Sequence, residues 1–398
     1  MKRRRFLRRT GAGLAGAAVL AGCTGTGDGD AGNGNGKAGT PSEAGDGSTE
    51  TSTAGTTNTA GGTAGSGETT GTAGDSPSGT LTVATYSSFT GEGTAGNWLK
   101  SAFEETYPGT TVEFVTPDNG VNRYIQRRSQ GAPIDADLYV GLNTDELVRA
   151  DRELEEPLFR SVANRLDRAD TVKDALRIDP EGRAIPYDTG YISLVYSEDE
   201  VDDPNSFDAL LEPAYENALI AENAQQSDPG RAFLFWTIIA KGADGYLDYW
   251  QGLVDNGVQI LADWEPAYQA YLDGEAPMVV SYSTDQVFYH GEDVDMSRHR
   301  IGFLNDQGYA NPEAMALFEG TEQAALARRF VDFALTEEAQ AEIAVRNVQF
   351  PAVEGVEPGA EFSKYALEPP EPVTMTYDEL SGSVETWVEQ WARQIAGG

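Results

Sequence analysis

Residues 184–197 read AIPYDTGYISLVYS and lie near the middle of the part of the chain with a globular composition. Every second residue from Ile192 to Tyr196 is large and apolar, a period of two that predicts a β-strand. Pro186 disfavours a helical residue before it, and Asp188 and Gly190 are typical of a tight turn. A strand entered through a corner predicts a crossing between two lobes, with a ligand beside it. An ordinary core strand is the alternative that these residues leave open.

The composition allows two domains of ordinary size within the 398 residues. The chain has 64 acidic and 28 basic residues, and only 6 of the basic residues are lysine. Such a negative surface disfavours nucleic acid and anionic membranes as partners, because both need positive potential. Concentrated salt screens the repulsion between like charges, so we expect a halophilic source.

The N-terminus predicts export. Residues 2–7 read KRRRFL, which matches a twin-arginine signal, and the apolar core at 11–22 is too short to span a bilayer. Residues 19–23 read VLAGC, a lipobox that ends in the only cysteine, Cys23. We expect cleavage of the signal peptide 1–22 and lipid attachment at Cys23, which anchors the protein on the outer face of the cell membrane. A generic signal peptide with an incidental cysteine is the alternative.

Residues 23–79 predict a disordered stalk. They are rich in threonine and glycine and contain no aromatic residue and no aliphatic residue larger than alanine, so they cannot form a core. A flexible coil of this length reaches on the order of 40 Å. Loss of residues 1–22 removes six basic and no acidic residues, which changes the formal charge from −36 to −42.

The remainder alternates between strand and helix patterns. Strands are predicted at 79–86, 112–115, 137–142 and 219–222, with an amphipathic helix around Trp98 and Phe103. This alternation indicates α/β lobes with largely parallel sheets, whose ligand-facing loops lie at the carboxyl ends of the strands. We predict that 80–186 and 286–345 form the first lobe and that 187–285 and 346–398 form the second. The strand at 278–283 is predicted as the return crossing.

Two further regions carry candidate binding residues. Asp228 and Pro229 predict the start of a helix whose free N–H groups could receive a polar ligand end, although most capped helices bind nothing. Between 260 and 290 the chain gathers four aromatic residues (Trp264, Tyr282, Phe288, Tyr289) and three carboxylates (Asp263, Glu265, Asp285). Aromatic faces with carboxylates suit a flat organic cation, while the alternative for each aromatic residue is simple core packing.

The order and spacing of several motifs resemble those of extracellular solute-binding proteins of ABC importers, and among them the periplasmic thiamine-binding family. The matching segments are TYSSF at 85–89, DLYVGL at 137–142, IPYDTGY at 185–191, SDPG at 227–230, DWEPAY at 263–268, SYS at 281–283, FYH at 288–290 and FPAV at 350–353. The resemblance implies a type II periplasmic-binding-protein fold, with two lobes joined by two hinge crossings. It also implies thiamine or its phosphates as the transported ligand.

Carried over position by position, the resemblance implies a set of ligand-binding residues. The aromatic walls would be Tyr86, Trp98, Trp264, Tyr282 and Tyr289. Ser87, Ser88, Asn119 and Gly120 would contact the ligand from the first lobe, and Ser227, Asp228 and Gly230 would meet its hydroxyethyl or phosphate end. Tyr187, Asp188 and Tyr191 are assigned to the hinge and the cleft floor, with Asp188 holding the turn.

Three positions depart from the family pattern. Ser87 stands where the family has an aspartate, Val348 where it has a tryptophan, and Asp228 where it has a threonine. A carboxylate at 228 would lie where a phosphate would bind. We therefore expect a preference for unphosphorylated thiamine over its diphosphate.

Other functions find less support in the sequence. A thiaminase-like enzyme of this fold needs a cysteine in the cleft, and the only cysteine belongs to the export signal. An iron-binding relative would be expected to have adjacent tyrosines, which this chain lacks, and His290 and His299 are expected at the surface with no nucleophile motif. A polyamine binder stays open, and a structural adhesin is disfavoured by the two-lobe plan. We expect a monomer with no catalytic residue, no metal and no cofactor, and with an importer permease and ATPase as partners.

Overall fold

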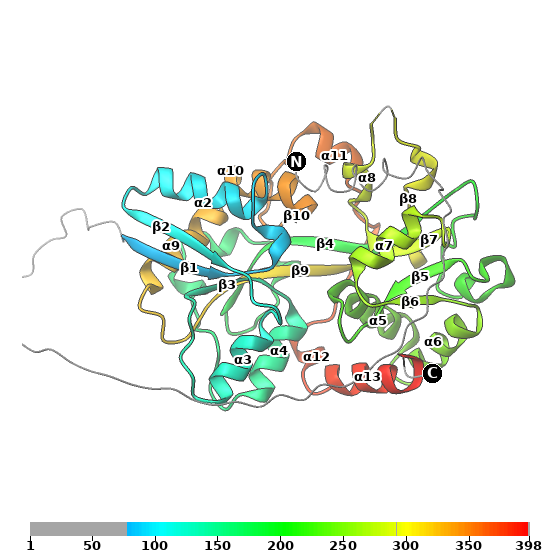
Figure 1. The fold of residues 1–398 in the computed structure, drawn as a ribbon, viewed down its shortest axis with the longest axis horizontal. Helices are drawn as coiled ribbons and strands as arrows, with labels where there is room; N and C mark the ends of the chain where they lie inside the picture. Colours follow the sequence, from blue (N-terminus) through cyan, green and yellow to red (C-terminus); the bar gives the residue numbers. More distant parts are fainter. Residues whose placement is uncertain (1–77, 292, 397–398) are drawn as a thin grey trace, which may run out of the picture. The chain divides into compact units, whose positions relative to one another are not determined.

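The computed structural model describes residues 78–291 and 293–396 (Figure 1). All of these residues belong to one compact unit. The predicted signal peptide, the lipid-attachment site Cys23 and the stalk up to residue 77 lie outside the described residues. Within the described ranges, every helix is too short or too polar to cross a membrane.

The strands form one sheet with the order β2-β1-β3-β9-β4-β7-β5-β6. Three short strands join it from the side: β8 and β10 pair with β4, and β11 pairs with β9. The strands are β1 (Gly79–Ala84), β2 (Thr110–Val115), β3 (Leu138–Leu142), β4 (Ala184–Tyr196), β5 (Leu219–Glu222), β6 (Gln259–Leu261), β7 (Met278–Tyr282), β8 (Arg300–Gly302), β9 (Gln307–Leu317), β10 (Phe350–Pro351) and β11 (Glu371–Val373).

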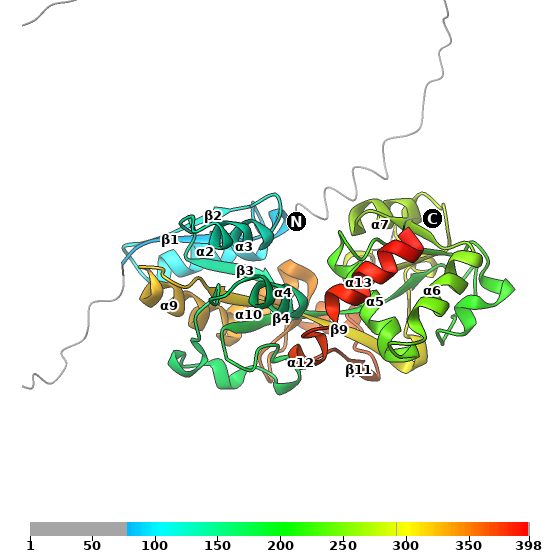
Figure 2. The ribbon, with the colours of Figure 1, turned by 90° about the horizontal axis from the view of Figure 1, so that it is seen from below.

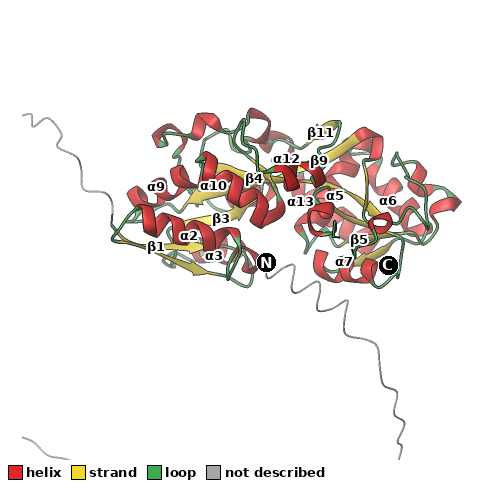
Figure 3. Ribbon diagram, turned by 90° about the horizontal axis from the view of Figure 1, so that it is seen from above, coloured by secondary structure: helices red, strands yellow, loops and turns green. Residues whose placement is uncertain are grey.

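Helices cover the strands on both faces (Figure 3). They are α2 (Ala95–Thr106), α3 (Asn122–Ser129), α4 (Thr144–Glu153), α5 (Asp228–Lys241), α6 (Tyr246–Asp255), α7 (Trp264–Leu272), α8 (Asp285–Phe288), α9 (Ala324–Ala334), α10 (Glu337–Ile343), α11 (Ala360–Tyr365), α12 (Tyr377–Leu380) and α13 (Val384–Trp391). α9 and α10 are separate helices, because Thr336 starts a new helix by accepting a hydrogen bond from the Ala339 N–H at 3.3 Å.

The described chain has two lobes. In the first, β1 pairs in parallel with β2 and β3, and α2, α3, α9 and α10 lie around these strands (Figures 1 and 2). In the second, β5 pairs in parallel with β6 and β7, and α5, α6, α7 and α13 lie around them. The long antiparallel strands β4 and β9 belong to both lobes and connect them.

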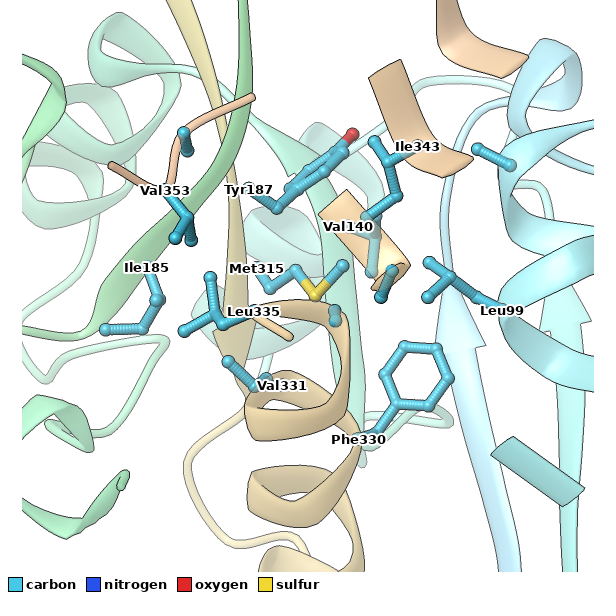
Figure 4. Packing of buried hydrophobic residues seen from close by; sticks show 14 of the residues in the cluster. Leu99, Val140, Ile185, Tyr187, Met315, Phe330, Val331, Leu335, Ile343 and Val353 are labelled. Atoms are coloured by element: carbon cyan, nitrogen blue, oxygen red, sulfur yellow. The ribbon is translucent and has the colours of Figure 1, made fainter. Parts of the chain in front are cut away.

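Each lobe has its own apolar core. Leu81 and Val83 alternate along β1 and pack with Leu99, Met315 and other side chains in the first cluster, part of which is shown in Figure 4. The second cluster is built around the largest buried side chains of α5, α6 and α13, which are Trp236, Trp250 and Trp391. Burial of one large apolar side chain contributes about 1.5–3 kcal/mol, so each cluster can hold its lobe together.

The predicted central strand is confirmed, but its entrance is not a tight turn. β4 runs without interruption from Ala184 to Tyr196 and is buried throughout. The register against β9 shifts between Pro186 and Asp188, so Tyr187 is the extra residue of a bulge. The bulge accommodates Pro186, which has no N–H to donate to a strand ladder.

The predicted return crossing is also wrong. Residues 278–282 form β7, which pairs with β4 and β5 inside the second lobe, where Met278 and Val280 belong to the second core. The chain returns along β9 instead. No strand was predicted there, and its Asn311–Pro312 dipeptide has a composition typical of a turn.

The packing also differs from the predicted division of the lobes. Phe350 and Phe362 lie in the first core, whereas Met375 and Trp391 lie in the second, so 346–398 does not belong to one lobe. Leu304, predicted in the first lobe, packs in the second core. The chain returns to the first lobe along β9 and enters the second lobe again after β11, which pairs with β9.

Candidate functional site

A cavity of about 320 Å³ lies between the two lobes, within the size range of small-molecule sites. It is bordered by the loop after β1, the end of β3, the first turns of α4, α5 and α7, the end of β7, the short helix α8 and the middle of β9. The lining residues are Tyr86, Ser88, Gly120, Tyr139, Gly141, Glu146, Asp228, Pro229, Trp264, Tyr268, Ser281, Tyr282, Thr284, Asp285, Phe288, Tyr289, Asn311, Glu313, Asn347, Val348 and Gln349. None of these lining residues is a lysine or an arginine.

One wall of the cavity is a stack of rings. Trp264 and Tyr268 are four residues apart on α7, which places them on one helix face with ring centroids 5.1 Å apart. Tyr268 continues onto Tyr289 at 6.0 Å, and Tyr289 onto His299 at 4.1 Å with an interplanar angle of 10°. Trp264 is fixed in turn by its indole N–H, which donates to the Ser281 hydroxyl at 3.0 Å.

Asp285 lies at the base of this stack. Its Oδ1 accepts a hydrogen bond from the Tyr268 hydroxyl, and its Oδ2 lies 2.8 Å from the Nδ1 of His299. Burial, together with the carboxylate of Asp285, raises the pKa of Tyr268 well above its usual range, so the phenol keeps its proton and donates. The surface position predicted for His299 is wrong, because only 5% of this residue is exposed.

Two more carboxylates line the cavity where α4 and α5 begin. Glu146 completes a capping box at the start of α4, where its Oε2 accepts from the Asn143 N–H at 3.3 Å. Burial raises the pKa of Glu146 to about 8, and the negative charges of Asp228 and Asp145 act in the same direction. Asp228 is paired with Arg231, whose Nε also contacts Asp145 at 2.8 Å.

The fourth carboxylate, Glu313, connects the first lobe to the crossing strands β4 and β9 through hydrogen bonds. Its Oε2 accepts from the hydroxyl of Tyr86 at 2.7 Å and from that of Tyr187. Asn347 donates to Tyr86 at 3.1 Å and to the carboxylate of Asp188 at 2.7 Å. The pKa of both tyrosines is raised well above the usual range by burial and by the two carboxylates, which keeps them as donors.

The predicted hinge residues all lie on β4, where they are buried. Tyr187 and Asp188 belong to the network around Glu313, and Tyr191 packs on Phe350 with ring centroids 5.1 Å apart. Although no two tyrosines are adjacent in the sequence, the hydroxyls of Tyr86 and Tyr187 lie 3.3 Å apart.

Seven of the twelve predicted ligand-binding residues line the cavity: Tyr86, Ser88, Gly120, Asp228, Trp264, Tyr282 and Tyr289. Five others do not. Ser87 and Asn119 are exposed outside the lining, and Trp98 stacks on Phe333 at 6.3 Å in the first lobe.

The remaining two predicted residues serve the start of α5. Ser227 is its cap and accepts from the Gly230 N–H at 3.3 Å, so the cap predicted at Asp228 is wrong by one residue. Gly230 permits close packing, because a Cβ there would lie 2.8 Å from the carbonyl oxygen of Glu222.

Sequence reasoning missed the lining residues that come from unrecognised elements. Asn311 and Glu313 lie on β9, and Asn347, Val348 and Gln349 follow α10. Tyr268 carried a usable signal, since it follows Trp264 by one helical turn.

Val348 adopts a positive φ of 58°, which is rare for a β-branched residue.

No three histidine or acidic side chains within the described ranges come together in a way that could hold a metal ion. The lining offers stacking surfaces and negative charge. Such a lining can hold a flat cationic molecule.

Comparisons with known proteins agree with this chemistry. The family described as "Bacterial extracellular solute-binding protein" matches residues 98–370. A "Thiamine-binding periplasmic protein" from Escherichia coli (strain K12) is 26% identical over 321 residues, which cover 79% of this chain and 93% of the relative. A protein of the same name from Haemophilus influenzae is 24% identical over 314 residues, which cover 78% and 91%.

Solved structures confirm the predicted type II periplasmic-binding-protein fold. A "Periplasmic thiamin binding protein" superposes with a TM-score of 0.67 and 26% identity, covering 81% of this chain and 99% of that one. An apo ferric ion-binding protein A from Pasteurella haemolytica superposes with a TM-score of 0.64 at 16% identity, covering 79% and 97%. At that lower identity, the second likeness shows the fold alone.

Proposed function

Because the chain belongs to the family of bacterial extracellular solute-binding proteins, we propose that it captures thiamine outside the cell and delivers it to an ABC importer. The observation that carries this proposal is the stacked wall of Trp264, Tyr268 and Tyr289 beside a cavity with four carboxylates and no basic lining residue. The relatives named for thiamine binding support the same ligand.

The chemistry of thiamine suits this lining. Thiamine joins a cationic thiazolium ring to an aminopyrimidine, and both rings are flat. Aromatic faces attract the cation and stack on either ring, while carboxylates balance the positive charge. Polar side chains such as Asn311 and Ser281 offer hydrogen-bond partners at the ring edges.

Unphosphorylated thiamine is the form that we propose as the preferred ligand. Asp228 and Glu146 line the cavity at the first turns of two helices, where a phosphate would otherwise be attracted. The cations beside this wall are already paired, Arg231 with Asp145 and Asp228 and Arg149 with Glu146. A diphosphate would therefore bring negative charge to an already acidic wall.

The rest of the proposal concerns the chain outside the described residues. Residues 1–22 would direct export by the twin-arginine route, Cys23 would carry the lipid anchor, and the stalk would hold a monomeric receptor near the permease and ATPase. We propose no enzyme activity and no cofactor. A thiaminase-like reaction would need a thiol, and no cysteine is among the residues that line the cavity.

A polyamine is the competing ligand, because four carboxylates also suit a chain of ammonium groups. A thermal-shift panel with thiamine, thiamine diphosphate and spermidine separates the two. A specific ligand raises the melting temperature with concentration as RT ln(1 + [L]/Kd) requires. We expect the largest shift with thiamine; a shift with spermidine and none with thiamine would replace thiamine by a polyamine.

A further inference from the structure

His299 and Asp285 form a pair whose role goes beyond wall packing. The Asp285 side chain is 4% exposed and that of His299 is 7% exposed, yet Asp285 lines the cavity. A polar group so poorly hydrated needs hydrogen-bond partners within the protein. It has one donor on each oxygen, the hydroxyl of Tyr268 on Oδ1 and the imidazole of His299 on Oδ2.

The two donors also fix where the carboxylate lies. Tyr268 and His299 are rings of the same stack, separated by Tyr289, so the carboxylate is held at the edge of the aromatic wall. Donors on both oxygens fix the side-chain rotation, since turning the carboxylate would break both hydrogen bonds. The carboxylate therefore stays beside the surface on which a flat cation would stack.

The other lining carboxylates are less suited to this role. Asp228 is ion-paired with Arg231. The pKa of Glu146 is raised to about 8 by burial, so this group is largely protonated at neutral pH. Glu313 is engaged by Tyr86 and Tyr187 at the crossing strands, away from the ring stack.

We propose that Asp285 balances the charge of the bound cation and that His299 is a positioning residue that holds this carboxylate toward the cavity. This inference rests on the proposed function, because it assigns the counter-charge for the same ligand. It makes a specific claim about selectivity. The pair should favour a cationic ring over an uncharged ring of the same shape.

The test compares thiamine with its neutral analogue 3-deazathiamine, in which an uncharged thiophene replaces the thiazolium, by calorimetric titration of the full chain in molar salt. We expect Asp285→Asn to weaken thiamine binding about tenfold or more, and to change binding of the neutral analogue by less than about threefold. A variant that weakens both ligands equally would overturn the assignment of Asp285.

Two variants separate the donor of His299 from its ring. His299→Phe keeps a ring against Tyr289 but removes the N–H, and we expect thiamine affinity to fall about tenfold. His299→Asn removes the ring but can place an amide N–H near the position of Nδ1, and we expect it to retain affinity within about threefold of wild type. Equal losses in the two variants, or no loss in His299→Phe, would overturn the positioning role.

His290 supplies a matched control. Its ring stacks on Tyr365 at 4.2 Å and its Nε2 lies 3.2 Å from Glu361, but it does not line the cavity. His290→Phe should leave both affinities unchanged. If His299→Phe fails to fold, the comparison of Asp285→Asn with His299→Asn still decides the claim. If the wild type binds neither thiamine nor the analogue, the proposed function fails and this inference fails with it.

Discussion

Replacing Glu146 by glutamine should make the protein more stable at alkaline pH. The residue is 8% exposed, and burial raises the pKa of its carboxyl from the ordinary value of 4.5 to about 8. In the unfolded chain the carboxyl ionises near its ordinary value, whereas the folded protein holds the proton up to about pH 8. The contribution of this carboxyl group to the free energy of unfolding is therefore fully present below pH 4.5, and it is lost as the pH rises from 4.5 to 8.

The size of the effect follows from the same two values. One pKa unit corresponds to about 1.4 kcal/mol, so a rise from 4.5 to about 8 costs the wild type at most about 5 kcal/mol above pH 8. Glutamine cannot ionise and still suits the capping box with Asn143. The stability of Glu146→Gln relative to wild type should thus grow steadily across this pH window.

Urea unfolding followed by tryptophan fluorescence, repeated between pH 4 and 9 in molar salt, measures the difference. Glu153→Gln, at the exposed end of the same helix, is the control. Its free energy of unfolding should depend on pH in the same way as that of the wild type. A Glu146→Gln curve that runs parallel to that of wild type over the whole range would refute the reasoning.

Three substitutions test which side chains contribute to ligand binding and which contribute to the stability of the fold. Trp264→Ala removes one face of the ring stack and should weaken thiamine binding about tenfold, measured by calorimetry, because a cation–π and stacking contact contributes about 0.5–2 kcal/mol. Trp98→Ala should instead lower the free energy of unfolding by about 3 kcal/mol and leave the affinity unchanged, because this ring packs on Phe333. Gly190→Ala should lower the free energy of unfolding by about 1–3 kcal/mol, because the added Cβ would collide with the ring of Tyr282. It should also weaken thiamine binding, because Tyr282 lines the cavity. An unchanged affinity would contradict the contact between Gly190 and Tyr282.

Local patterns allowed much of the fold to be predicted. The alternation of apolar residues identified β1 and β4, and the predicted strand 219–222 coincides with β5. Asp228 and Pro229 identified the start of α5. Patterns of this kind depend on neighbours within one or two turns, and so the sequence shows them directly.

The crossing strand β9 could not be predicted in this way. Its Asn311–Pro312 dipeptide has turn composition, yet both residues pair with β4, at Gly190 and Thr189. Tertiary pairing overrides local preference here, because β4 supplies partners for a strand that is weak by composition. With β9 missed, the carboxylate of Glu313 was missed as well.

The candidate site was also only partly predictable from the sequence. Trp264 and Tyr289 could be identified because aromatic residues crowd that part of the sequence. The pairing of Tyr86 with Tyr187 could not, because 101 positions separate them and only the tertiary fold brings their hydroxyls together. His299 was expected at the surface because its sequence neighbours are polar, although its ring packs on Tyr289.

Calorimetric titration of the full chain in molar salt with thiamine and with thiamine diphosphate tests the proposed function most directly. We predict saturable binding of one thiamine per chain and at least about tenfold weaker binding of the diphosphate, because the lining contains no lysine or arginine that could receive a phosphate. Tighter binding of the diphosphate, or no binding of either ligand, would contradict it.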